Sequence, residues 1–92
     1  MPASSEATAT LPADVDLHAR PAATFVRAAM GYEAQVTIAA AGREADAKSL
    51  LSVLGLGAKA GTTVALRADG PDAAAAVEGL AELLGSLVES AA

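Results

Sequence analysis

The side chains with the clearest chemical potential lie together in a short stretch, residues 16–26. The stretch holds His18, the single histidine of the 92 residues, and Arg20 and Pro21 follow closely behind it. An imidazole nitrogen can attack phosphorus as a nucleophile, and a guanidinium offers a forked set of donors that suits phosphate oxygens. The spacing is compatible with a phosphoryl group carried by His18, although a lone histidine at a helix start is also often a plain surface residue.

A helix is expected to begin directly after this histidine. Over residues 19–30 the apolar positions recur at a spacing typical of one helix face; they are Ala22, Phe25, Val26 and Ala29. Pro21 fits the first turn, where its missing N–H has no partner to lose. The unpaired first amides, those of Ala19 and Arg20 among them, lie at the positive end of the helix macrodipole and favour an anion. The helix start beside His18 is therefore a candidate phosphate cradle.

The rest of the chain divides into strands and helices by its periodicity and turn signals. The predicted strands are Ala7 to Leu11, Ala34 to Ile38, a short polar strand after the turn at 41–43, and Thr62 to Arg67. Ser49 is expected to cap a short helix that glycines close. Pro71 is expected to open the last helix, whose apolar rhythm reaches Val88.

The order of these elements, βαββαβα, predicts an α+β fold. We expect an open-faced β-sandwich, in which a four-stranded antiparallel sheet is covered on one face by three helices. Polar alternates such as Gln35, Thr37 and Arg67 would then meet water on the other face. Residues 1–5 are expected to form a disordered N-terminal segment, and residues 6–90 a single domain.

The composition argues against several classes of protein. Six basic residues against eleven acidic residues give a net charge of −5 without a basic block, so no nucleic-acid partner is expected. The absence of cysteine, together with a single histidine, predicts neither a disulfide framework nor a metal site. The sequence has no apolar run long enough for membrane insertion and no signal peptide, which makes a cytoplasmic location the expectation.

Two segments resemble a known family. LHARPAATFV, residues 17–26, resembles the active-site segment of HPr, the histidine-containing phosphocarrier of the bacterial phosphoenolpyruvate-dependent sugar phosphotransferase system. DAKSLLSVLGLGAKAGTTVALRADGPDA, residues 46–73, is similar to that family's central helix, glycine-rich connection and last strand. The resemblance extends from about Glu6 to Glu89, which is nearly the whole chain.

The resemblance implies that His18 accepts a phosphoryl group on Nδ1 from phosphorylated enzyme I and donates it to sugar-specific IIA proteins or domains. Arg20 and the backbone donors of Ala19 and Arg20 would hold the group. The protein would then be a monomeric phosphoryl carrier rather than an independent enzyme, and it would need no cofactor.

The resemblance also implies roles for residues outside the histidine segment. Ser49 occupies the place of the serine that an HPr kinase modifies in some bacteria, although serine is an excellent N-cap and would be favoured there for that reason alone. An apolar patch for docking enzyme I and IIA proteins would be formed by Leu50, Leu51 and Leu54. Arg27 would be a basic residue on the partner side of the first helix.

The chain departs from the family pattern at Asp16, where glycine is most frequent, and at Met30, where a basic residue is frequent. The charge of Asp16 is expected to favour a protonated imidazole and to repel an incoming phosphoryl group, so that Asp16→Gly would speed charging. The alternative is that Asp16 points to solvent and does little. If this position requires a positive φ, aspartate tolerates it better than most residues.

Two other functions stay open at this point. The first is a regulatory or nitrogen-branch HPr paralogue, which would signal through the same phospho-histidine. The second is a non-catalytic protein-binding module with an unused histidine. A nucleotide site is not expected, because the glycines of GLGAKAG, residues 55–61, miss the Gly-x-Gly-x-x-Gly spacing by one.

Overall fold

The strand pattern of the sequence is realised as one antiparallel sheet. The computed structural model describes residues 4–87, and its strands are β1 (Ser4–Thr10), β2 (Gln35–Ala40), β3 (Arg43–Asp46) and β4 (Thr63–Asp69). Their order across the sheet is β1-β4-β2-β3, and each neighbouring pair is antiparallel. The sheet is therefore complete only when β1 and β2 have both paired with β4, the last strand in the sequence.

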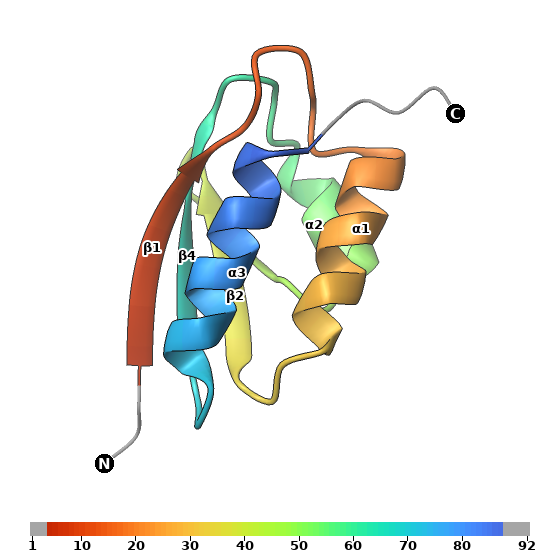
Figure 1. Cartoon of the computed structure of the whole chain (residues 1–92). Coiled ribbons are helices and arrows are strands. Elements are labelled where there is room, and N and C mark those ends of the chain that lie inside the picture. The colour runs from red at the N-terminus through yellow and green to blue at the C-terminus, as the bar shows by residue number, and fades with distance from the viewer. Residues whose placement is uncertain (1–3, 88–92) are drawn as a thin grey trace.

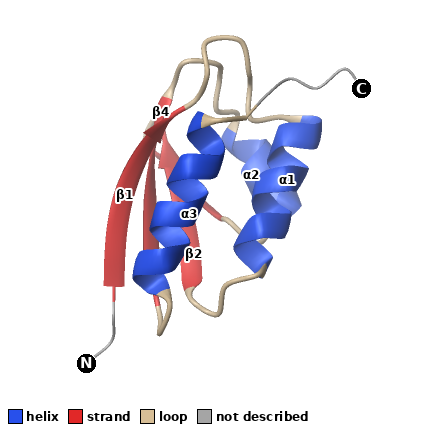
Figure 2. Cartoon of the chain, in the orientation of Figure 1, coloured by secondary structure: helices blue, strands red, loops and turns tan. Residues whose placement is uncertain are grey.

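The helices are α1 (Ala19–Met30), α2 (Leu50–Leu56) and α3 (Ala73–Gly85). All three lie on the same face of the sheet (Figure 1), and the two layers are separated clearly when the elements are coloured by type (Figure 2). The expected α+β open-faced sandwich is confirmed. Within residues 4–87, no helix has the length and apolar character that crossing a membrane requires.

The core lies between the sheet and the helices. In β4, Val64, Leu66 and Ala68 are buried while the residues between them are exposed, and β2 shows a related alternation. Each large apolar side chain that becomes fully buried contributes about 1.5–3 kcal/mol relative to an exposed one. The largest fully buried side chains are Phe25, Leu11, Leu17, Ile38, Leu66, Leu80, Leu84, Val15, Val53 and Val64. Leu and Val therefore supply most of the large buried side chains, with Phe25 as the aromatic one among them.

Some element boundaries differ from those predicted. β1 begins at Ser4, because Ser4 and Ser5 pair with Asp69 and Ala68 of β4, so these two serines belong to the sheet rather than to a disordered start. At the other end Leu11 follows the strand, and its N–H still donates to the Thr62 carbonyl at 2.9 Å. Residues 1–3, Val88 and the expected domain end at residue 90 lie outside the described residues.

Asp72 joins two distant connections at one end of the molecule. Asp72 is the N-cap residue of α3, but its carboxylate makes no cap bond there. It accepts instead from the backbone N–H groups of Glu33 and Ala34, at 2.9 and 2.8 Å. These bonds, that from Glu33 foremost, lower the pKa of Asp72 below its ordinary value. Nearby, Gly70 lies so close to Ala34 that a Cβ at residue 70 would be 2.7 Å from the Ala34 Cα.

Candidate functional site

His18 is the N-cap residue of α1 and lies at the surface. Its backbone is extended, with φ −139° and ψ 158°, and its side chain makes no cap hydrogen bond. Its carbonyl accepts the Ala22 N–H at 3.4 Å, and its own N–H donates to the Asp16 carbonyl at 2.9 Å. The backbone of His18 is thus held from both sides while the imidazole stands at an exposed position, where a protein partner can reach it.

Ala19, the residue after this histidine, has a left-handed backbone. Its φ is 42°, a conformation that costs an L-residue other than glycine roughly 1–2 kcal/mol. Among residues 4–87 one other non-glycine residue, Ala41, has a positive φ. Ala41 and Gly42 form the two-residue loop of the β2–β3 hairpin, where a positive φ is the rule. No hairpin accounts for Ala19, and nothing in the alanine-rich sequence signals its conformation.

The basic side chains expected at the site share the outer side of α1. Arg20 and Arg27 are exposed, seven positions or about two turns apart. The opposite side of the helix is buried, and its buried residues are Pro21, Ala22, Phe25, Val26 and Ala29. Pro21 therefore both starts the helix and anchors the turn beside His18 in the core. Met30, near the other end, has 64% of its surface exposed.

α2 presents part of the expected leucine patch. Leu51 is 82% exposed and Leu50 is 42% exposed. Leu54 is half-buried and packs against the core, so it offers less apolar surface than expected. Val53 of the same helix is fully buried. α1 packs against α2 (Figure 1), so Leu50 and Leu51 lie on the neighbour of the helix that carries Arg20 and Arg27.

Ser49 is the N-cap residue of α2, as predicted. Its hydroxyl accepts the backbone N–H of Ser52 at 3.3 Å. The helix ends at Gly57, whose φ of 67° is left-handed, the conformation that glycine favours at this position. The capping function of Ser49 is therefore realised in this structure, and it does not exclude modification of a half-exposed hydroxyl.

Asp16 has neither the positive φ nor the free, solvent-directed side chain that the sequence analysis considered. It is not among the residues with positive φ, so no glycine-like conformation is required there. Its carboxylate is not free in solvent either: Oδ1 accepts the backbone N–H of Ala60 at 2.7 Å. Asp16 thus connects the histidine loop to the glycine-rich connection between α2 and β4. No local sequence signal indicates this contact, since its two residues are 44 positions apart.

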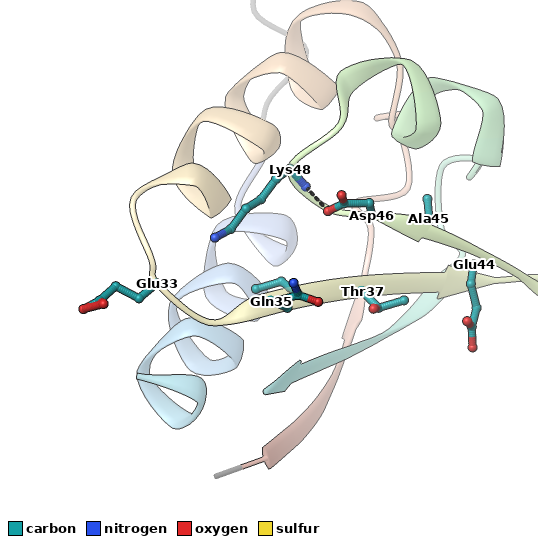
Figure 3. Close-up of a pocket in the computed structure, with 8 residues that line it drawn as sticks. Glu33, Gln35, Thr37, Glu44, Ala45, Asp46 and Lys48 are labelled. Carbon is teal, nitrogen blue, oxygen red and sulfur yellow. Dashed lines mark hydrogen bonds between the residues drawn. The ribbon is translucent and has the colours of Figure 1, made fainter. Parts of the chain in front are cut away.

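Two hollows lie on the open face of the sheet. One, of about 500 Å³, is lined by residues of β2, β3 and the loops beside them, including Glu44, Asp46 and Lys48. Figure 3 shows this hollow, with the Lys48 backbone N–H donating to Asp46 Oδ1 at 2.9 Å. A neighbouring hollow of about 710 Å³ is lined mainly by β1, β2 and β4. His18 lines neither, and the described residues contain no group of three or more His, Cys, Asp or Glu that could hold a metal ion.

The comparisons with known proteins agree with this arrangement. The family model described as the PTS HPr component phosphorylation site matches residues 5–86. The phosphocarrier protein HPr of Vibrio cholerae is 44% identical over 75 residues, which cover 82% of this chain and 88% of that protein. The HPr of Streptomyces coelicolor is 50% identical over 74 residues, covering 79% of this chain and 80% of that protein.

The fold is also shared with a solved structure of the same kind. The crystal structure of HPr from Bacillus anthracis superposes with a TM-score of 0.84 at 30% identity, covering 89% of this chain and 98% of that one. The match of the family model to most of the chain and the identity to the two phosphocarriers give the same assignment. The chain therefore belongs to the HPr family of phosphocarrier proteins of the phosphotransferase system.

Proposed function

We propose that this protein accepts a phosphoryl group on Nδ1 of His18 from phosphorylated enzyme I and donates it to IIA proteins or domains. The observation that carries the proposal is the exposed imidazole at the extended N-cap of α1, in a chain of the HPr family. In the first transfer the lone pair of Nδ1 attacks phosphorus while the bond to the donor breaks. In the second transfer a nucleophilic residue of the IIA protein attacks phosphorus while the bond between phosphorus and Nδ1 breaks, which leaves the imidazole free again. The protein would act as a cytoplasmic, monomeric carrier that needs no cofactor.

The residues around His18 are suited to holding the phosphoryl group without trapping it. The guanidinium of Arg20 and the first backbone N–H groups of α1, those of Ala19 and Arg20 included, offset its negative charge. His18, Ala19 and Arg20 are all exposed, and interactions between charges are weak in such a high-dielectric setting. Phosphoryl transfer depends mainly on positioning and electrostatics, so an exposed site keeps the group available to the next partner.

The surface next to His18 supplies a docking area for these partners. Arg27 on α1 and the exposed Leu50 and Leu51 on α2 combine a positive charge with an apolar patch. Apolar contacts at the centre of an interface and charges at its rim are typical of protein docking. The arginines of α1 would attract acidic partner surfaces although the whole chain carries a net charge of −5. Leu54 contributes mainly through the packing of α2.

Ser49 is proposed as a regulatory site for an HPr kinase. A phosphoryl group on its oxygen would bring a charge near −2 to the start of α2, beside Leu50. The charge would favour the helix N-terminus but oppose the docking of acidic partners on the adjacent leucines. Modification of Ser49 would thus weaken the reception of phosphoryl groups without touching His18.

Labelling tests the proposal directly. We expect incubation with enzyme I and phosphoenolpyruvate to give one acid-labile, alkali-stable phosphoryl group, which His18→Ala abolishes and Ser49→Ala does not. Transfer onward to a purified sugar IIA protein would support the sugar branch, whereas transfer only to nitrogen-branch partners would assign the protein to a regulatory paralogue. A folded protein that takes no label, yet binds enzyme I, would overturn the carrier function in favour of a binding module.

A further inference from the structure

The loop that leads to His18 is fastened to the glycine-rich connection by a series of hydrogen bonds. The loop spans residues 11–18 and the connection spans residues 57–62; the two run side by side at one end of the molecule (Figure 1). Three backbone bonds join them: Leu11 N–H to the Thr62 carbonyl at 2.9 Å, Gly61 N–H to the Pro12 carbonyl at 3.0 Å, and Leu17 N–H to the Ala58 carbonyl at 2.9 Å. The fourth bond is the one between the Asp16 carboxylate and the Ala60 N–H.

The bond made by Asp16 is the one in this series that involves a side chain. Its Oδ1 receives the Ala60 N–H at 2.7 Å, a distance typical of a hydrogen bond to a charged acceptor. Its backbone carbonyl receives the His18 N–H at 2.9 Å. Asp16 therefore binds the glycine-rich connection with its side chain and His18 with its main chain. Leu17, between Asp16 and His18 in the chain, is buried.

The backbone next to His18 needs contacts that hold it in place. Directly after His18, Ala19 adopts a left-handed φ of 42°, which a free chain would avoid. A strained residue persists only where the surrounding contacts determine its conformation. On the N-terminal side of Ala19, those contacts are the bonds made by Asp16 and Leu17; on its C-terminal side lies the buried Pro21.

We propose that Asp16 is a positioning residue for phosphoryl transfer, whose carboxylate anchors the histidine loop on Ala60 and so holds His18 in register with Arg20. This inference rests on the proposed carrier function. It reverses the effect that charge alone predicts, because loss of the carboxylate slows transfer through a displaced acceptor instead of speeding it through weaker repulsion. A displacement of a reacting group by about 1 Å can lower the rate of a reaction by about a hundredfold.

Three variants separate positioning from charge. Asp16→Ala removes both the acceptor and the charge, while Asp16→Asn keeps an acceptor oxygen and removes only the charge. Asp14→Ala is the matched control, because it removes one exposed carboxylate from the same loop. For each variant, amide hydrogen exchange at Leu17, His18 and Ala60 is measured by NMR, and kcat and KM are measured with the variant as the substrate of enzyme I.

We expect Asp16→Ala to speed exchange at Ala60 about tenfold, and also to speed exchange at Leu17 and His18, because the loop loses its anchor. We expect the same variant to lower kcat about fivefold with KM nearly unchanged. Asp16→Asn should change both measurements in the same direction but less than Asp16→Ala, because the amide oxygen still accepts the Ala60 N–H, although more weakly than a carboxylate does. Asp14→Ala should stay within about twofold of the unmodified protein. Faster transfer in both Asp16→Ala and Asp16→Asn would overturn the inference in favour of charge repulsion. Unchanged exchange at Leu17 and His18 in Asp16→Ala would also overturn it, whether or not the protein takes a phosphoryl group. Failure of the unmodified protein to be labelled would refute the carrier function separately, since exchange needs no enzyme I.

Discussion

Replacing Ala19 by glycine should stabilise the protein, although the substitution lies at the start of a helix. At φ 42° the alanine Cβ is unfavourably placed, and its removal should recover roughly 1–2 kcal/mol. The glycine gives the unfolded chain more freedom, which costs about 0.4–1 kcal/mol. The net gain is then between about 0 and 1.6 kcal/mol, and its midpoint of about 0.8 kcal/mol corresponds to a rise in Tm of about 3–6 °C for a domain of this size.

Two alanine-to-glycine controls make the measurement specific. Ala41, with φ 53° in the hairpin loop, should respond to the same substitution with a similar gain. Ala75 is exposed on α3, and there glycine should cost about 1 kcal/mol because the helical backbone gains nothing from it. Urea unfolding followed by circular dichroism gives the three changes in the free energy of unfolding under one set of conditions.

Ala19→Gly and Ala41→Gly should both be more stable than Ala75→Gly, and urea unfolding can contradict this order. A loss of stability in Ala19→Gly as large as that in Ala75→Gly would mean that Ala19 has an ordinary helical backbone. The strain beside His18, and the need for contacts that hold it, would then be wrong. A gain in Ala41→Gly without one in Ala19→Gly would restrict the left-handed conformation to the hairpin.

Three further predictions concern α2 and α3. The backbone N–H groups that donate to Asp72 lower its pKa. The stability that Asp72 contributes is therefore complete above its ordinary pKa of 3.8 and is lost as the pH falls through the lower pKa of the folded state. Unfolding measurements between about pH 2 and 6 should show the free energy of unfolding fall with falling pH, and Asp72→Ala should make this dependence on pH weaker. Ser49→Ala should lower the free energy of unfolding by about 1 kcal/mol through loss of the α2 cap, and equal stability of the two proteins in urea would contradict the capping bond. Leu51→Ala should change stability by less than about 0.5 kcal/mol but raise the KM of the enzyme I reaction in which this protein is the substrate. Val53→Ala, at a buried residue, should destabilise by about 2 kcal/mol and change the KM of the folded protein little. The reverse pattern in urea unfolding and transfer assays would mean that Leu51 does not belong to the docking surface.

Much of the fold follows from periodicity, which is a local property. Val64 and Leu66 alternate with small or polar residues over a run long enough to predict one strand, and Phe25 with Val26 marks one side of a helix. Because burial and strand or helix geometry share the same period, the residues that the spacing places on one side are also the ones that the structure buries. The strand ends were less predictable: Ser4 and Ser5 join β1 only because β4 extends far enough to pair with them.

The candidate site divides in the same way. His18, Arg20 and Pro21 are adjacent in the chain, so their types and order suffice to predict an imidazole at a helix start. The partial burial of Leu54 depends on what packs around α2, and a seven-residue helix contains too little periodicity to separate it from Leu50.

The sequence alone determined the order of strands and helices along the chain, the position of His18 at a helix start and the resemblance to a phosphocarrier family, because each depends on residues close together in the chain. The tertiary structure decided which distant residues the loop carboxylates contact. Asp16 meets Ala60 across 44 positions and Asp72 meets Ala34 across 38, and such contacts exist only after the sheet and helices have brought distant loops together. The residues next to a loop carboxylate do not indicate its partner, and for that reason the contact between Asp16 and Ala60 could be found only in the folded protein.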